Sequence, residues 1–287
     1  MAGVVASDAA RKTDAMKARI CIGATPEIAT VPSPPTGRLP PIRLVLDRTP
    51  SEGIARDEES AGGSEVRDGG LTGTMDRVLG VSWGTTLALA YAQTHPQRVS
   101  ALVLALVTTT SRREVDWITR GVGCIFPRER QRFADAVPDS LRQMRLVDAY
   151  ATLLFDPDHD VRERAAREWC AWEDSHISLA PGHLPNPRFD DADFRLRFAR
   201  LVTHYWRHAA FLDDEQLLRD APMLDGVPGV LIHGRYDVSS PLETAWRLSQ
   251  RWSTSRLQLL DDAGRGGGDT FVGAVTGALR QLAVDVT

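Results

Sequence analysis

The chain alternates between short apolar runs, which are typical of buried strands, and longer stretches with one apolar face, which are typical of helices. The clearest example begins with the apolar pair Val78 and Leu79, continues through the alanine- and leucine-rich stretch 85–93, and ends with the apolar run 101–107. Pro96 separates the last two segments, because proline cannot continue a helix. The pattern therefore predicts a strand, a helix and a second strand.

The same alternation returns near the carboxyl terminus, where two strands and two helices are expected over 229–233, 241–252, 257–260 and 270–283. The residues in between predict helices only, over 115–122, 127–136, 141–155, 160–179, 191–210 and 213–220. Asp139 and Ser140 indicate a cap for the helix that is expected at Leu141. Strands that alternate with helices favour an α/β fold with a mostly parallel sheet flanked by helices. We therefore assign residues 74–108 and 222–287 to this core and residues 109–221 to an inserted helical cap.

Residues 1–73 follow neither pattern. The segment 32–41 is rich in proline, which lacks the amide donor that a central strand needs, and the segment 51–73 is polar with no apolar period. Only 18–22 and 42–46 read as strands. We expect a poorly ordered or atypical N-terminal extension, with a partner-binding tail as the alternative.

Composition excludes several classes of protein. The chain has 287 residues with a formal net charge of −4, from 34 basic and 38 acidic side chains, so no basic surface for nucleic acid is expected. It has no apolar run of membrane-spanning length and no apolar core of a signal peptide, so a cytoplasmic protein without a membrane partner is expected. Its three cysteines are scattered, so neither disulfides nor a zinc site are predicted, and no metal or other cofactor is expected.

The junction between the first strand and its helix carries the sequence Gly80-Val81-Ser82-Trp83-Gly84, a G-x-S-x-G motif. At such a junction this motif forms the nucleophile elbow of α/β-hydrolases, in which a sharp turn exposes the serine hydroxyl at the start of the helix. Glycines two places to either side leave room for the strand and the helix to approach. Ser82 is therefore predicted to be a nucleophile, and an ordinary strand–helix turn is the alternative.

Several separated segments, in order, resemble the proline iminopeptidases (prolyl aminopeptidases), which are serine hydrolases of the α/β-hydrolase fold. They are the stretch 80–116, REWCAWEDSHISL at 167–179, HYWRHAAF at 204–211 and PGVLIHGRYDVSSPLETAW at 228–246. The likeness covers roughly residues 76–285. It implies removal of an N-terminal proline from a small peptide, or hydrolysis of a related amide or ester.

The resemblance also implies roles for individual residues. Ser82 would be the nucleophile, Asp237 the carboxylate that orients the catalytic base, and the amide of Trp83 a donor to the oxyanion. Glu173 would anchor the amino group of the substrate. Two alternatives stay open: Asp237 as an ordinary turn or helix-capping residue, and Glu173 as a solvated carboxylate on a helix face.

The family's catalytic histidine is missing. It lies in an A-G-H-x-G-G turn after the last strand, where this chain has alanine, glycine and Arg265 followed by two glycines. A guanidinium donates hydrogen bonds but accepts no proton, so Arg265 cannot activate a serine. His233 is not expected to replace the base, because strand alternation points its side chain away from the following loop.

Two further positions depart from the family. The H-G-G-P-G loop, whose amide supplies a second oxyanion donor, does not occur in residues 1–79, and the early strands have no recognisable counterpart. The strand that leads into Ser82 is therefore expected to present an open edge. A second glutamate, expected shortly before His204 and Tyr205, is Val202 here.

Three functions fit these observations. The favoured one is a proline iminopeptidase-like serine hydrolase that is catalytically impaired, because loss of a triad member costs on the order of 10⁴ to 10⁶ in turnover. The alternatives are a non-catalytic or truncated homologue that acts as a binding protein, and a general esterase or amidase.

Overall fold

The computed structural model describes residues 42–44, 76–179, 184–265 and 268–284. At its centre lies a sheet whose strands are neighbours in chain order and are all parallel. They are β1 (Ile42–Leu44), β2 (Asp76–Val81), β3 (Val99–Ala105), β4 (Gly229–Gly234) and β5 (Ser255–Leu260). The predicted parallel sheet is confirmed, whereas the strand expected at 18–22 lies outside the described residues.

The strand that leads into Ser82 is paired on both sides. In β1, Ile42 lies opposite Arg77 and Leu44 lies opposite Leu79, and β3 pairs with the other edge of β2. The expectation of an open edge beside the nucleophile is therefore wrong. A parallel neighbour does not have to be close in sequence, so the short apolar segment near residue 42 supplies the pairing although the intervening chain is polar.

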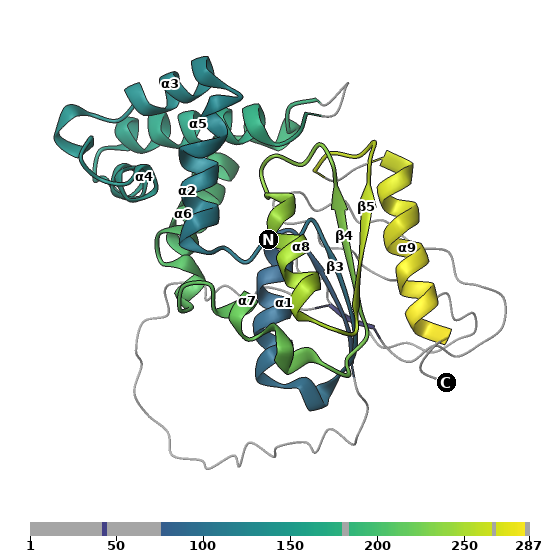
Figure 1. Ribbon diagram of the computed structural model, residues 1–287. Helices are drawn as coiled ribbons and strands as arrows, with labels where there is room; N and C mark the ends of the chain where they lie inside the picture. Colours follow the sequence, from purple (N-terminus) through teal and green to yellow (C-terminus); the bar gives the residue numbers. More distant parts are fainter. Residues whose placement is uncertain (1–41, 45–75, 180–183, 266–267, 285–287) are drawn as a thin grey trace, which may run out of the picture.

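Alternating residues of the strands face two separate hydrophobic layers. In β3, Leu102 and Leu104 pack against α1 (Trp83–Thr94), α7 (Gln216–Arg219) and α8 (Leu242–Arg251). Val103 and Ala105 pack on the other face, against α9 (Gly268–Val284). Figure 1 shows the sheet between these helices. The continuous apolar run predicted for β3 arises because both of its faces are buried.

Most of the helices between β3 and β4 lie beside the sheet (Figure 1), and they enclose a hydrophobic core of their own that α7 does not join. Phe133, Tyr150, Trp169 and Trp172 are buried at its centre, and the rings of Phe133 and Tyr150 stack at 4.4 Å. These helices, which we call the cap, are α2 (Arg112–Thr119), α3 (Pro127–Asp135), α4 (Leu146–Leu154), α5 (His159–His176) and α6 (Ala192–Arg207). None of the helices in the described ranges combines the length and apolar character that a bilayer crossing requires.

One predicted helix start is wrong. Asp139–Leu141 forms a short 3₁₀ turn, and α4 begins only at Leu146. The chain between them is exposed at Arg142, Gln143 and Met144, so it has no apolar face to bury and no reason to be helical. The helix-capping signal at Asp139 therefore belongs to this turn and not to the start of α4.

The chain enters and leaves the cap through two unusual segments. At the entry, the buried carboxylate of Glu114 accepts hydrogen bonds from the amide and hydroxyl of Thr109, both at 2.8 Å, and from the hydroxyl of Thr244 on α8, at 2.7 Å. At the exit, Ala209, Ala210 and Phe211 have φ values of 47°, 56° and 60°. Left-handed backbone costs non-glycine residues roughly 1–2 kcal/mol each, so this exit stores strain.

Candidate active site

Ser82 occupies the turn between β2 and α1. Its φ of 54° and ψ of −123° lie in a region that non-glycine residues rarely adopt, and such strain is found mostly at functional sites. The turn is held by its backbone: the Ser82 amide donates to the carbonyl of Ala105 at 2.9 Å, and the Thr85 amide donates to the carbonyl of Ser82 at 2.8 Å. The local geometry is that of a nucleophile elbow.

The glycines that flank Ser82 are not equivalent. A Cβ on Gly80 would lie 2.6 Å from the carbonyl oxygen of Gly84, so the close approach of strand and helix requires glycine there. A Cβ on Gly84 would meet nothing within 4 Å. The expectation that both glycines provide clearance is therefore wrong for Gly84.

Asp237 lies in the turn that follows β4, and its side chain is fully buried. Its Oδ1 accepts a hydrogen bond from the amide of Ser240 at 3.0 Å, which closes the turn on itself. A parallel sheet brings the carboxyl ends of its strands to one edge, so this turn lies at the same edge as the elbow after β2.

A second turn, after β5, is held against the first one. A Cβ on Gly234 would lie 2.5 Å from the carbonyl oxygen of Ala263, so glycine allows the two turns to touch. The amide of Tyr236 donates to that same carbonyl at 2.9 Å. These contacts place Arg265, two residues farther along, beside Asp237.

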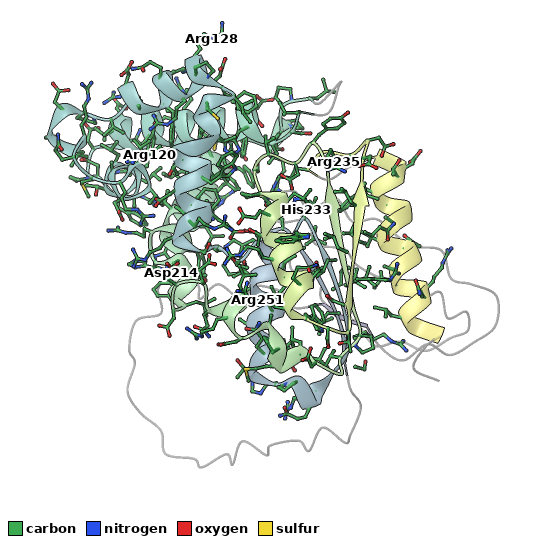
Figure 2. The ribbon with its side chains drawn as sticks, in the orientation of Figure 1. Arg120, Arg128, Asp214, His233, Arg235 and Arg251 are labelled. Carbon is green, nitrogen blue, oxygen red and sulfur yellow. The ribbon has the colours of Figure 1, made fainter. Side chains whose placement is uncertain are left out.

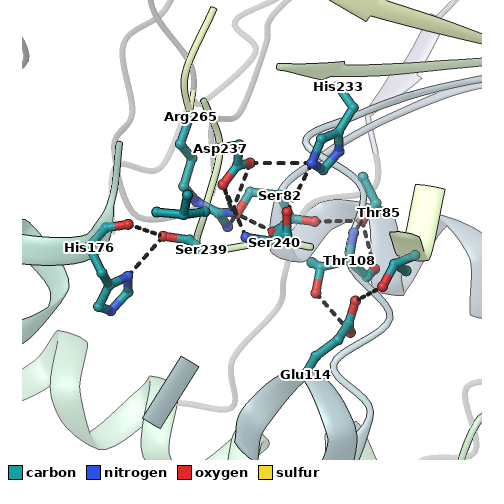
Figure 3. A network of polar contacts seen from close by, with 12 residues as sticks. Ser82, Thr85, Thr108, Glu114, His176, His233, Asp237, Ser239, Ser240 and Arg265 are labelled. Atoms are coloured by element: carbon teal, nitrogen blue, oxygen red, sulfur yellow. Dashed lines mark hydrogen bonds and ion pairs between the residues drawn. The ribbon is translucent and has the colours of Figure 1, made fainter. Parts of the chain in front are cut away.

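The guanidinium of Arg265 joins the predicted nucleophile to the predicted acid (Figure 3). Its Nη2 donates to the Oγ of Ser82 at 2.5 Å, and its Nη1 donates to Oδ1 and Oδ2 of Asp237 at 3.3 and 3.2 Å. Nη1 also donates to the Oγ of Ser240 at 2.5 Å. Arg265 thus takes the place between serine and carboxylate that an imidazole base would need.

His233 lies closer to this site than strand alternation predicts. It is fully buried at the end of β4, and its Nε2 donates to the carbonyl of Ser240 at 3.0 Å. The same nitrogen lies 3.9 Å from Oδ2 of Asp237. The prediction that it points away from the loop is wrong, because the turn folds back so that Asp237 and Ser240 lie beside the ring (Figure 3). Figure 2 shows the position of His233 in the whole molecule. Among the described residues, no hydrogen bond joins an imidazole to the hydroxyl of Ser82.

Glu173 is buried on α5 in the cap, with 7% of its surface exposed, so the alternative of a solvated surface carboxylate is wrong. Its Oε2 lies 3.9 Å from Nε2 of His176, which is fully buried one turn farther along the helix. Burial raises the pKa of Glu173 to about 7, although the positive charge of Arg265 opposes this shift. Burial, reinforced by the charge of Arg265, lowers the pKa of His176 to about 3.

These two shifts affect stability in opposite directions. The folded protein keeps a proton on Glu173 that the unfolded chain releases above its ordinary pKa of 4.5, so stability falls as the pH rises from there to about 7. The unfolded chain takes up a proton on His176 below its ordinary pKa of 6.5, and the folded protein does not, so stability falls as the pH drops from there toward 3.

The remaining predicted positions are Trp83, Val202 and the segment before the elbow. Trp83 is the first residue of α1, where amides have no acceptor within the helix, and its ring makes a T-shaped contact with Tyr205 at 4.8 Å between centroids. Val202 packs against the core of the cap. The segment in which a second oxyanion donor was sought lies almost entirely outside the described residues.

Sequence reasoning missed three polar residues that surround Asp237. Ser239 and Ser240 lie two and three residues after it, and their hydroxyls bond to His176 and Arg265. His176 lies three residues after Glu173, a spacing that places two helical side chains on one face. That spacing was the available signal, whereas the serine contacts depend on how the turn folds.

Comparison with known proteins gives consistent results. A model of the alpha/beta hydrolase fold family matches residues 76–268. A probable proline iminopeptidase of Streptomyces coelicolor is 47% identical over 197 residues, which is 67% of this chain and 60% of that protein. Proline iminopeptidases of Arabidopsis thaliana and Xylella fastidiosa are 35% and 38% identical, over 69% and 67% of this chain and 52% and 61% of those proteins. The chain therefore spans between about half and three-fifths of these relatives' length.

Proposed function

Because the chain belongs to the α/β-hydrolase family, we propose that it is a prolyl aminopeptidase-like serine hydrolase whose turnover is limited by Arg265. Ser82 would attack the carbonyl carbon of the N-terminal proline itself, so that the amine of the remaining peptide leaves, and Asp237 would be the acid of the site. The relatives named proline iminopeptidase support the choice of substrate.

The observation that carries the proposal is the position of the Arg265 guanidinium between the Oγ of Ser82 and the carboxylate of Asp237. When the serine oxygen bonds to the carbonyl carbon, its proton must pass to a base. A guanidinium is already protonated at neutral pH and has no free lone pair for that proton. The attacking oxygen thus remains a neutral alcohol, which lowers its nucleophilicity.

The substrate's amino group fits Glu173. An N-terminal proline carries a protonated secondary amine near neutral pH, and a buried carboxylate binds such a cation when it is ionised. Because the pKa of Glu173 is raised to about 7, its affinity for the cation would increase as the pH rises through neutrality. The amide of Trp83 would then stabilise the negative charge that develops on the carbonyl oxygen.

A second candidate function is a binding protein without hydrolysis. The hydrogen bonds from Arg265 to both Ser82 and Asp237 favour it, because they occupy the donor and acceptor groups that catalysis would use. A general esterase or amidase is a third candidate, because the elbow itself does not select proline.

The test is a comparison of labelling and turnover on the full chain. A fluorophosphonate probe should label Ser82 slowly, because only an activated hydroxyl reacts quickly. A proline-anilide and a simple ester should both be hydrolysed slowly, with all activity lost in Ser82→Ala. Rapid labelling with fast turnover would contradict the role given to Arg265, and no Ser82-dependent turnover of either substrate would favour the binding protein.

A further inference from the structure

The turn that carries Asp237, which we call the acid turn (residues 236–240), is held by the cap as well as by the core. The indole nitrogen of Trp117, on α2, donates to the carbonyl of Val238 at 2.8 Å. The amide of Leu179, just after α5, donates to the carbonyl of Tyr236 at 3.1 Å. Two cap segments that are far apart in sequence therefore hold consecutive parts of the acid turn.

His176 makes the most enclosed of these contacts. The hydroxyl of Ser239 donates to the backbone carbonyl of His176 at 2.9 Å, and Nδ1 of His176 lies 2.9 Å from the same hydroxyl oxygen. Since the single hydroxyl proton is used toward the carbonyl, the oxygen must accept from Nδ1–H. Both residues are buried, so this reciprocal pair is shielded from water (Figure 3).

Ser240, the neighbour of Ser239, connects Ser239 to the carboxylate of Asp237. The amide of Ser240 donates to Oδ1 of Asp237 at 3.0 Å, and the carbonyl of Ser240 accepts from Nε2 of His233 at 3.0 Å. A rotation of the backbone at Ser239 would move both groups of Ser240. The carboxylate would then lose the amide that fixes its orientation.

The far side of the His176 ring faces Glu173. The Nε2 atom of His176 has no hydrogen-bond partner among the described residues, and neither has Oε1 of Glu173, although Nε2 lies 3.9 Å from Oε2. With Nδ1 protonated toward Ser239, the low pKa of His176 leaves a lone pair on Nε2. One ring thus borders the predicted amino-group anchor on one side and the acid turn on the other.

We propose that His176 is a positioning residue for Asp237: acting from the cap through Ser239, it fixes the acid turn in the conformation that orients the carboxylate. This inference rests on the proposed function in one respect only, namely that Asp237 is the acid of the site. The cap is then part of the machinery that sets the catalytic geometry.

Hydrogen exchange on the full chain tests the structural half of this inference without any need for activity. His176→Phe keeps a ring but removes the donor, His176→Asn keeps a donor near the Nδ1 position, and Ser239→Ala removes the partner. We expect the amide of Ser240 to exchange about tenfold faster in the phenylalanine and alanine variants, and within about threefold of the parent rate in the asparagine variant.

Ser175→Ala is the matched control, because among the described residues the hydroxyl of Ser175 bonds within α5, to the carbonyl of Ala171 at 2.7 Å. Its exchange at Ser240 should equal that of the parent protein. If His176→Phe does not fold, the exchange rates of the Ser240 amide in Ser239→Ala and in His176→Asn are compared instead, and the first should be the faster. Unchanged exchange at Ser240 in Ser239→Ala would overturn the inference.

A kinetic cycle tests the functional half in the Arg265→His background. There, His176→Phe should lower kcat for a proline-anilide about tenfold and change KM less than about twofold. In a variant that also carries Asp237→Asn, His176→Phe should cause no further decrease in kcat, because the carboxylate that His176 positions is gone. An equal loss in the presence and absence of Asp237 would overturn the inference. If Arg265→His shows no turnover, the proposed function fails, and the exchange measurement still decides the role of His176.

Discussion

Replacing Arg265 by histidine should convert a blocked site into a working one. Nη2 and Nη1 of Arg265 already touch the Oγ of Ser82 and the carboxylate of Asp237, so an imidazole near this place would have both partners it needs. A complete triad would regain on the order of 10⁴ to 10⁶ in turnover. Because a histidine side chain is shorter than an arginine side chain, we expect only part of this gain, roughly 10²- to 10³-fold, or about 3–4 kcal/mol of transition-state stabilisation.

The assay is hydrolysis of a proline-anilide and of a simple ester by the parent, by Arg265→His, and by each combined with Ser82→Ala. Arg265→Gln is the matched control, since it removes the guanidinium without adding a base. It should stay nearly inactive. It should also lower the free energy of unfolding by about 3 kcal/mol, because it leaves the buried carboxylate of Asp237 without its counter-charge.

Two results would refute this reasoning. If the glutamine variant gains as much activity as the histidine variant, the arginine acts by obstruction and the missing base is not the cause. If the parent protein already hydrolyses the anilide rapidly and Ser82→Ala abolishes that activity, Arg265 does not prevent activation of the serine.

Three further predictions concern stability, each measured by urea unfolding. In the parent protein, stability should fall by about 3 kcal/mol as the pH rises from 4.5 to 7, and Glu173→Gln should remove this fall. His176→Asn should leave that fall in place and should remove the separate loss of stability below pH 6.5. Parent-like pH profiles in both variants would contradict the two pKa shifts. Gly80→Ala should destabilise the protein by about 2 kcal/mol or more, whereas Gly84→Ala should be tolerated, so equal effects would be inconsistent with the packing at the elbow. Ala210→Gly should stabilise the protein by about 1 kcal/mol by relieving left-handed strain, and a destabilised glycine variant would show that the strain is absent.

Most of the core was predictable from sequence because its signals are local. The apolar runs at β3 and β4 and the G-x-S-x-G spacing at Ser82 each report on a few neighbouring residues, and the family resemblance supplied the position of Asp237. The exception was β1, whose pairing with β2 joins segments separated by a long polar stretch. Helix starts in the cap were less predictable. Helix α4 begins at Leu146 because the residues from there on are buried against other helices, and the capping signal at Asp139 does not set its start.

Sequence reasoning named Ser82, Asp237 and Arg265, which the structure brings together, but it missed Ser239, Ser240 and His176 and could not give the contacts. The sequence placed Arg265 where a histidine was expected, and the structure adds that its guanidinium bridges Ser82 and Asp237. The orientation of His233 and the burial of Glu173 depend on how a turn and a helix pack after folding. Periodicity cannot report on these features, since it describes one element at a time.

The strict chain order of the sheet has a consequence for how the molecule reaches its native state. Strands β3 and β4 are adjacent, yet everything from residue 106 to 228 lies between them along the chain. Joining them directly from the unfolded chain requires closing a very long loop, and such non-local pairing is slow. The cap has a self-contained apolar interior drawn from residues 115–199, so it can collapse first and bring the two strand ends together. We therefore expect protection from exchange to develop in the cap before it develops between β3 and β4 during refolding.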